Sequence, residues 1–460
     1  MFFSFIVWSR LSRERWSVFY FKKQTQSKLW TILITNLQNF TILINICVYI
    51  IKQYFCYSFC IFFVKEQINN TMTTKSLLLL AICFSTIHLY ANQNSVIVGA
   101  EQYEEYFPIL KDKRIALLGN HTSIANGKHL LDILVENNIN VVAAFSPEHG
   151  FRGSADAGEH VSSEVDSKTG VAILSLYDGN TGKPKESDIR RFDLLIVDIQ
   201  DVGLRFYTYY IAMIRMMDAC AEYDREVLIL DRPNPNGFYV DGPILDMKYK
   251  SGVGWLPIPV VHGMTLAELA LMANGEGWLN ESKKCKLSVI PCKNYNHQTI
   301  YKLPIAPSPN LPDMKSIYLY PSTCYFEATP ISLGRGTDKP FKIYGHPNMK
   351  GYNYSFTPKS ISGAKNPPQL NQTCYGADLS NIPDEIIWKK GIDLSYLIDA
   401  YQNMNLGNHF FRDFFEKLIG VSYVRQMILA GKNSEEIKMM WKDDVIKFKL
   451  QRKPYLLYEE

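Results

Sequence analysis

The chain has 460 residues, 47% of them hydrophobic and 20% charged, which predicts a folded protein of two to three domains and excludes a disordered chain. The formal net charge is +4, but residues 1–91 contain nine Lys and Arg against two Asp and Glu, a surplus of +7, so residues 92–460 carry −3. A folded part without a basic excess gives no indication of nucleic acid as a partner.

The N-terminal 91 residues are predicted to lie outside the folded protein. Residues 1–71 are rich in Phe, Ile, Asn and Lys, and we interpret them as a non-native or disordered extension before a true start at Met72. A basic start, a short apolar run over residues 77–89 and a small residue at position 91 are typical of a secretory signal peptide. We therefore expect residues 72–91 to be a signal peptide and the mature protein to be exported, periplasmic or secreted.

A membrane helix over residues 29–64 is the alternative for this region. That segment carries polar side chains, including Asn36, Asn45 and Lys52, which are costly inside a bilayer. The composition therefore favours a mature chain with no stable membrane span.

Short apolar runs alternate with amphipathic segments from residue 96 onward. The runs are nearly continuous, as in strands buried on both faces, and they lie at residues 114–118, 141–145, 171–176, 194–197, 227–230 and 258–261. Helices are predicted between and after them, at residues 128–137, 209–223 and 266–274. This alternation predicts an α/β fold with a Rossmann-like parallel sheet over residues 96–305.

The texture of the sequence changes after about residue 304. A Pro-rich stretch at residues 306–312 predicts an irregular loop, and short strands and terminal helices follow, with a helical pattern over residues 434–450. We expect a smaller C-terminal α/β auxiliary domain over residues 306–460, and an active cleft between the two domains.

Polar residues follow strand after strand of the predicted sheet. In an open parallel sheet, ligands bind in the crevice at the carboxyl ends of the strands. No G-x-G-x-x-G or Walker A motif follows any strand, so a nucleotide is not expected. No His or Cys pair has a metal-ligand spacing, and no strand ends in G-x-S-x-G, so we expect neither a metal nor a cofactor, nor a Ser-His-Asp triad.

Carboxyl groups at this edge are the catalytic candidates. Glu148 comes directly after a buried strand, between Pro147 and His149, where loss of water would raise its pKa and suit it to general acid catalysis. A structural glutamate bonded to the backbone or to Arg152 is the alternative. Asp198 and Asp201 follow another strand and are further catalytic candidates, although Asp198 could simply cap a turn.

Four arginines, Arg152, Arg205, Arg232 and Arg335, lie in loops punctuated by Gly or Pro. A guanidinium can bind a substrate carboxylate by two parallel hydrogen bonds, and internal pairing with Asp201 or Asp338 is the alternative for each.

At these loops the chain resembles the exo-β-N-acetylmuramidase family of NamZ-like glycoside hydrolases, formerly a domain of unknown function. The resemblance covers residues 98–458 and rests on GNHTSI (119–124), FSPEHGFRG (145–153), DIQDVGLRFYTY (198–209), LDRPNPNG (230–237), HGMTLAELALMANGEGWL (262–279), SPNLP (308–312), YPSTCYFEATPISLGRGTDKPF (320–341) and RKPYLLY (452–458). Leu204 departs from the small residue expected there.

The resemblance implies release of terminal N-acetylmuramic acid from the non-reducing end of peptidoglycan fragments, with muropeptides and saccharides ending in that sugar as partners. It implies that Glu148 is the acid. The candidate substrate-binding residues are Asn120, His149, Arg152, Arg205, Tyr207, Arg232, Asn234, His262, Glu327, Arg335 and Asp338. The second catalytic group is left open among Asp198, Asp201, Glu327 and the substrate's own acetamide. A non-catalytic periplasmic sugar- or muropeptide-binding protein is the alternative function.

Overall fold

The structure is a computed structural model that describes residues 95–147, 150–151, 163–176 and 184–460. The predicted extension at residues 1–71 and the predicted signal peptide at residues 72–91 lie outside the described residues. Residues 94–460 form one compact unit. Within the described residues, no helix is long and apolar enough to cross a membrane.

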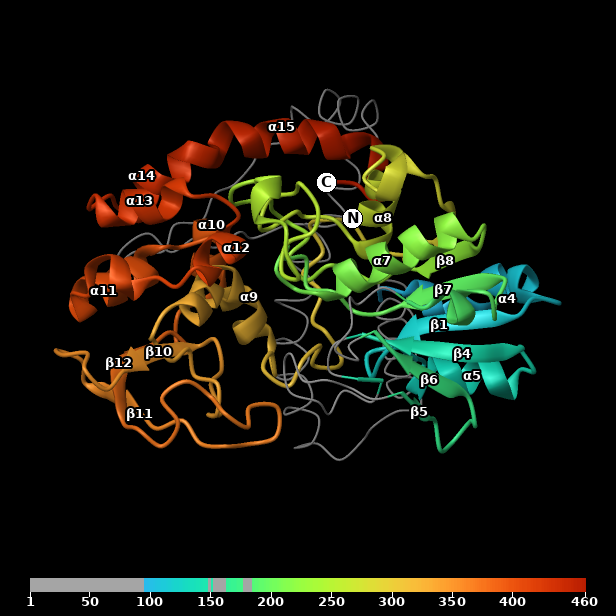
Figure 1. Cartoon of the computed structure of the whole chain (residues 1–460), viewed down its shortest axis with the longest axis horizontal. Coiled ribbons are helices and arrows are strands. Elements are labelled where there is room, and N and C mark those ends of the chain that lie inside the picture. The colour runs from blue at the N-terminus through green and yellow to red at the C-terminus, as the bar shows by residue number, and fades with distance from the viewer. Residues whose placement is uncertain (1–94, 148–149, 152–162, 177–183) are drawn as a thin grey trace, which may run out of the picture. The chain divides into compact units, whose positions relative to one another are not determined.

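A seven-stranded sheet forms the centre of the N-terminal half (Figure 1). Its order is β5-β6-β4-β1-β7-β8-β9, in which β5 pairs antiparallel with β6 and every other neighbouring pair is parallel. Ordered by sequence, the six parallel strands follow the Rossmann arrangement 3-2-1-4-5-6. The strands are β1 (Ile115–Gly119), β4 (Val141–Ser146), β5 (Glu164–Val165), β6 (Ala172–Ser175), β7 (Leu194–Asp198), β8 (Glu226–Leu230) and β9 (Lys286–Ile290).

Alternate residues of the central strands enter two separate hydrophobic clusters. In β1, Leu117 packs into one cluster and Leu118 into the other. The helices α7 (Tyr209–Glu222) and α8 (Leu266–Gly275) cover one face, while α4 (Tyr103–Leu110) and α5 (Leu130–Glu136) contribute to the cluster on the other (Figure 1). Because both faces are covered, the central strands are continuous apolar runs. The predicted α/β fold with a parallel sheet is confirmed.

The prediction of a sixth strand at residues 258–261 is wrong. Val261 makes only isolated bridges, with Leu204 and Asp241, and Pro259 has no N–H for a strand ladder. The sixth parallel strand is β9 instead, an edge strand whose residues are mostly half-buried or exposed. The run at 258–261 is apolar because it is buried in a loop, which sequence alone does not distinguish from a buried strand.

The C-terminal half carries a small antiparallel sheet and a series of helices (Figure 1). The sheet order is β10-β12-β11, with β10 at Ile343–His346, β11 at Tyr354–Phe356 and β12 at Cys374–Asp378. The helices are α9 (Met314–Thr323), α10 (Asp384–Lys390), α11 (Ser395–Met404), α12 (Phe414–Ile419), α13 (Tyr423–Leu429), α14 (Ser434–Lys438) and α15 (Lys442–Arg452). The helix predicted over residues 434–450 is divided by a 3₁₀ turn, Met439–Trp441, where the Trp441 side chain is buried.

Short elements complete the described chain. They are the helix α6 (Glu186–Ile189), the strands β2 (Ile124–Ala125) and β3 (Lys128–His129), and the 3₁₀ turns η1 (Gly99–Glu101), η2 (Met247–Tyr249), η3 (Asn280–Ser282), η4 (Cys324–Ala328), η5 (Gly407–Phe410) and η7 (Lys453–Tyr455). Residues 306–312 form an irregular segment, as predicted. The larger hydrophobic cluster contains residues of both halves, so the core is continuous across the predicted domain boundary.

Candidate functional site

The strands β1 and β7 lie side by side at the centre of the sheet. The chain continues from β1 to β4 on one side and from β7 to β8 on the other, so the connections diverge at the carboxyl ends of these two strands. Such a switch point leaves a crevice where ligands bind in Rossmann-type folds. Three predicted site residues come together here, namely Asn120 after β1, Asp198 at the end of β7 and Arg232 after β8.

Asp198 and Arg232 form a buried ion pair. Arg232 Nε donates to Asp198 Oδ1 at 2.6 Å, and Nη2 donates to Oδ2 at 3.0 Å. Nη2 also donates to the carbonyl oxygen of Ile124 at 2.9 Å. Burial disfavours the charged guanidinium, but the adjacent carboxylate raises the pKa of Arg232 above its ordinary value. The pair ties together the chain segments that follow β1, β7 and β8.

The loop after β1 is held by polar contacts that start at Asn120. Its Oδ1 accepts hydrogen bonds from the backbone N–H of Thr122 at 2.9 Å and from the Thr122 hydroxyl at 2.6 Å. Its Nδ2 is buried and has no partner among the described residues. Ser123 Oγ accepts from the Asn120 N–H at 3.0 Å and donates to the carbonyl oxygen of Asp198. Asn120 is therefore fixed in place by its side-chain oxygen, while its Nδ2 donors face no acceptor in the described part of the chain.

Glu148, His149 and Arg152 lie outside the described residues. The chain on either side of Glu148 is described. Ser146 ends β4 and is buried, and the Gly150 N–H donates to the carbonyl oxygen of Pro147 at 3.2 Å. Phe151 is buried against the ring of His129, with centroids 4.9 Å apart. Ser146, two residues before Glu148 in the sequence, thus lies at the carboxyl end of β4, the strand beside β1.

Asp201 lies in the turn after β7 and is almost fully buried. Its Oδ1 accepts from the Gly203 N–H at 2.7 Å, while Oδ2 has no partner among the described residues. Burial raises the pKa of Asp201 to about 7. It lines a small cavity together with residues such as Gln200, Asn234 and Thr265. With this pKa the carboxyl group can hold a proton near neutral pH, and its side chain is buried inside the protein.

Arg205 has a different environment from the one predicted for a substrate-binding arginine. Its guanidinium is fully buried, and Nη1 and Nη2 donate to four backbone carbonyl oxygens at 2.7 to 3.0 Å. The acceptors are Pro243, Ile258, Leu418 and Ile419. Burial lowers the pKa of Arg205 to about 10. Arg205 links the end of α12 to the N-terminal half, and we assign it a structural role.

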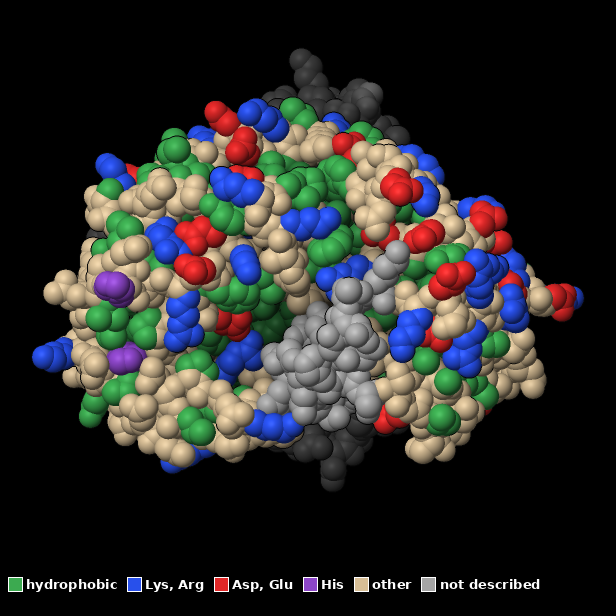
Figure 2. Space-filling model, viewed as in Figure 1, with side chains coloured by type: hydrophobic (Ala, Val, Ile, Leu, Met, Phe, Trp, Pro, Cys, Tyr) green, Lys and Arg blue, Asp and Glu red, His purple; other side chains and the backbone are tan. Residues whose placement is uncertain are grey.

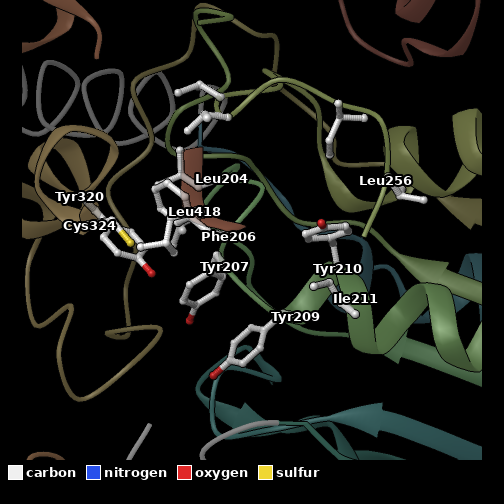
Figure 3. Packing of buried hydrophobic residues seen from close by; sticks show 14 of the residues in the cluster. Leu204, Phe206, Tyr207, Tyr209, Tyr210, Ile211, Leu256, Tyr320, Cys324 and Leu418 are labelled. Atoms are coloured by element: carbon white, nitrogen blue, oxygen red, sulfur yellow. The ribbon is translucent and has the colours of Figure 1, made fainter. Parts of the chain in front are cut away.

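Tyr207, Asn234 and His262 are also buried in internal contacts. The Tyr207 hydroxyl donates to the carbonyl oxygen of Pro307 at 2.9 Å, and Figure 3 shows its ring beside the labelled Tyr209. Asn234 Nδ2 donates to the carbonyl oxygen of Met264 at 2.9 Å. Burial lowers the pKa of His262 to about 3, so its ring is neutral. Of the three, only Asn234 lines the small cavity beside Asp201.

Gly203, which lines the same small cavity, packs closely against Asn234. Its φ is +77°, and a Cβ atom at this position would lie 2.2 Å from Asn234 Oδ1. Only glycine combines this backbone conformation with such close packing. The turn after β7 therefore depends on a residue without a side chain.

Glu327 and Arg335 form a charged pair in the C-terminal half. Arg335 Nε and Nη2 both donate to Glu327 Oε1, at 3.2 and 2.5 Å. The two side chains are 23% and 18% exposed, in contrast to the fully buried Asp198. Asp338 is exposed on the same loop. Figure 2 shows a hollow next to the grey residues, with acidic and basic side chains in its wall.

Ser123 and Gln200 are two further polar residues at this edge of the sheet, and neither was among the residues predicted for the site. Ser123 joins the segments after β1 and β7, and the Gln200 side chain donates to the carbonyl oxygens of Asp201 and Pro233, both at 2.8 Å. Both residues lie in the post-strand segments, which was the available signal. Within the described residues, no group of three or more His, Cys, Asp and Glu is arranged to hold a metal, and the five described cysteines are free and buried.

The fold is that of an α/β protein with polar and charged residues gathered at the carboxyl ends of its parallel strands, and comparison with known proteins gives its family. The family described as "Exo-beta-N-acetylmuramidase NamZ, N-terminal" matches residues 115–315, and the corresponding C-terminal family matches residues 318–458. The chain is 37% identical over 380 residues to "Peptidoglycan beta-N-acetylmuramidase NamZ" of Bacillus subtilis (strain 168), covering 77% of this chain and 89% of that protein.

Two crystal structures of DUF1343 family proteins from Bacteroides fragilis are similar. One has a TM-score of 0.75 and 69% identity, covering 80% of this chain and 99% of that chain. The other has a TM-score of 0.68 and 27% identity, covering 80% and 100%. The chain belongs to the NamZ family. It is a glycosidase of the muramidase type.

Proposed function

We propose that this protein is an exo-acting glycoside hydrolase that releases terminal N-acetylmuramic acid from the non-reducing end of peptidoglycan fragments, with Glu148 as the general acid. The observation that carries the proposal is the Rossmann-order sheet, whose switch point gathers Asn120, Asp198 and Arg232 beside the strand that leads into Glu148. A proton delivered by a carboxyl group to the glycosidic oxygen allows the bond to the anomeric carbon to break.

Recognition of the sugar's lactyl carboxylate is the second part of the proposal. Of the three described arginines among the candidates, Arg205 is occupied by backbone carbonyls and Arg232 by Asp198. Arg335 is partly exposed, and its described hydrogen bonds to Glu327 use only Nε and Nη2. Arg335 and Arg152 are therefore the arginines that we propose for the carboxylate.

Export is a third part of the proposal, supported by the basic start, apolar run and small residue over residues 72–91. Mass spectrometry of the protein isolated from its native host should find a mature N-terminus near Ala91. Retention of residues 1–71 on that protein would contradict it.

One assay distinguishes the proposed hydrolase from the alternative, a muropeptide-binding protein without activity. The purified chain is incubated with a chromogenic β-glycoside of N-acetylmuramic acid and with saccharides that end in this sugar. We expect release of the chromophore and of free N-acetylmuramic acid from the non-reducing end only. Tight binding of the saccharides without any turnover would favour the binding protein, and cleavage at internal bonds would contradict the exo mode.

A further inference from the structure

Three carboxyl groups in the described part of the chain are candidates for the group that acts together with the general acid. Asp198 has no exposed surface, and both of its oxygens accept hydrogen bonds from Arg232. Asp201 is enclosed in the turn after β7, where burial raises its pKa to about 7. Neither of them presents an ionised oxygen to a substrate.

Glu327 differs from both in its exposure and in its free oxygen. Its side chain is 23% exposed, and the described hydrogen bonds from Arg335 both end on Oε1. No described hydrogen bond uses Oε2. Two donors on one oxygen fix the orientation of the carboxylate and leave the other oxygen open to a ligand.

A chain of aromatic contacts connects this pair to the carboxyl edge of the sheet. The Arg335 guanidinium lies 5.1 Å from the centre of the Phe341 ring, and Phe341 lies 4.6 Å from Tyr320. Tyr320 in turn packs against Tyr207, with ring centroids 6.4 Å apart, in the segment that follows β7 (Figure 3). These contacts join the pair, on the C-terminal half, to the segment that follows β7.

We propose that Glu327 is the carboxylate on the face of the anomeric carbon opposite the leaving group, and that Arg335 is its positioning residue. This proposal rests on the proposed function, in which Glu148 protonates the glycosidic oxygen as its bond to the anomeric carbon breaks. The new bond to that carbon forms from the opposite face. Glu327 either provides the attacking oxygen itself or takes the proton of the attacking water, which the configuration of the first product distinguishes.

The test is chemical rescue of Glu327→Ala with azide, using an aryl β-glycoside of N-acetylmuramic acid. We expect turnover to fall at least about 100-fold, as for the loss of a catalytic acid or base. Azide fills the space of the lost carboxylate and forms a nitrogen–carbon bond as the aryloxide leaves. The expected product is the α-glycosyl azide, identified by NMR. Activity within a few-fold of wild type, or no azide product, overturns the proposal.

Matched variants separate chemistry from stability. Glu327→Gln keeps an acceptor for Arg335 and replaces the alanine variant if that variant shows no cooperative thermal transition. The glutamine variant should bind the sugar without turnover. Retained turnover in this variant would contradict the proposal. Glu416 provides the control, because it also pairs with a partly buried arginine, Arg425, that lies 5.6 Å from the centre of a phenylalanine ring. Glu416→Ala should keep wild-type turnover.

Arg335 is tested by a conservative pair of variants. Arg335→Lys should retain part of the kcat that Arg335→Leu loses, because an ammonium can still pair with Glu327 and a leucine side chain cannot. Equal loss in both variants would contradict the positioning role. A wild-type protein without activity, or an active Glu148→Gln variant, would instead refute the proposed function. Failure of the Glu327 proposal alone appears as an active wild type, an inactive Glu148→Gln variant and an unimpaired Glu327→Ala variant.

Discussion

Asp198 at the end of β7 and Arg232 after β8 are joined by two hydrogen bonds, of 2.6 and 3.0 Å, where the connections of the sheet diverge. The pair also contacts the chain after β1 through the carbonyl oxygen of Ile124. It holds the segments after β1, β7 and β8 in one arrangement, and its two charges neutralise each other. We therefore expect the pair to contribute to the free energy of unfolding, which can be measured.

Arg232→Leu should lower the free energy of unfolding by about 3–5 kcal/mol, because it leaves the Asp198 carboxylate buried without a partner. Urea denaturation of both proteins measures the change. The exposed pair of Arg190 and Glu186 is the control, and Arg190→Leu should change stability little. A loss below about 1 kcal/mol for Arg232→Leu would show that the pair does not carry this part of the fold.

Arg205→Leu should also destabilise the protein rather than alter its specificity. Four buried carbonyl oxygens each lose a donor, of which that of Ile258 still accepts from the Leu245 N–H, and each group left unsatisfied costs about 1–3 kcal/mol. Gly420 adjoins this contact with φ +87°, and a Cβ there would lie 2.5 Å from Arg205 Nη2. Thermal unfolding measures the effect. A variant of unchanged stability with weakened binding of N-acetylmuramic acid would restore Arg205 as a substrate-binding residue.

Asp201 predicts a pH dependence of stability. An aspartate in an unfolded chain ionises near pH 3.9, whereas burial raises the pKa of Asp201 to about 7. Between these values the folded state binds more protons than the unfolded state. The free energy of unfolding therefore falls as pH rises through this interval, by at most about 1.4 kcal/mol per pH unit for this group.

Asp201→Asn should remove this pH-dependent loss of stability. The free energy of unfolding of the variant minus that of the wild type should therefore increase from pH 4.5 to pH 7 and then level off. Denaturation at several pH values tests this. Asp224, an exposed aspartate with positive φ that asparagine tolerates, provides the control for the same substitution at the protein surface. A relative stability of Asp201→Asn that is constant with pH would mean that Asp201 is ionised in the folded protein.

The lactyl carboxylate should give N-acetylmuramic acid a preference over N-acetylglucosamine. A partly desolvated contact with arginine contributes about 1.5–3 kcal/mol, which corresponds to a preference of roughly tenfold to a hundredfold. Arg152→Leu or Arg335→Leu should weaken binding of the first sugar but not of the second. The exposed Arg412 is the control. If both replacements affect both sugars equally, specificity comes from the shape of the pocket.

The central strands could be predicted from sequence because burial on both faces makes β1 and β7 continuous apolar runs. The edge strand β9 could not, since its residues are only partly buried and its pattern is weak. The loop at 258–261 is as apolar as a strand because it packs inside the protein. An apolar run indicates that a segment is buried. Which other strand it pairs with depends on residues far away in the sequence, so the run alone cannot show whether it belongs to a sheet.

In the candidate site, too, some features could be predicted from the sequence and others could not. The post-strand position of Asn120, Asp198 and Arg232 was sufficient to predict that they meet at one edge. The acceptors of Arg205 lie 38 to 214 residues away along the chain, so no local pattern could reveal that its guanidinium is internally occupied. The same limit applies to the pairing of Arg335 with Glu327 rather than with Asp338.

The account depends most directly on Glu148, and the decisive measurement is the turnover of Glu148→Gln on a substrate with a poor leaving group. Glutamine keeps the shape of the side chain but cannot deliver a proton to the leaving oxygen. The rate should fall about 10²–10⁴-fold, with little loss on a highly activated aryl glycoside. Glu164→Gln, at an exposed position of β5, should match wild type. A folded Glu148→Gln variant that keeps most of its activity on the poor leaving group would contradict the account.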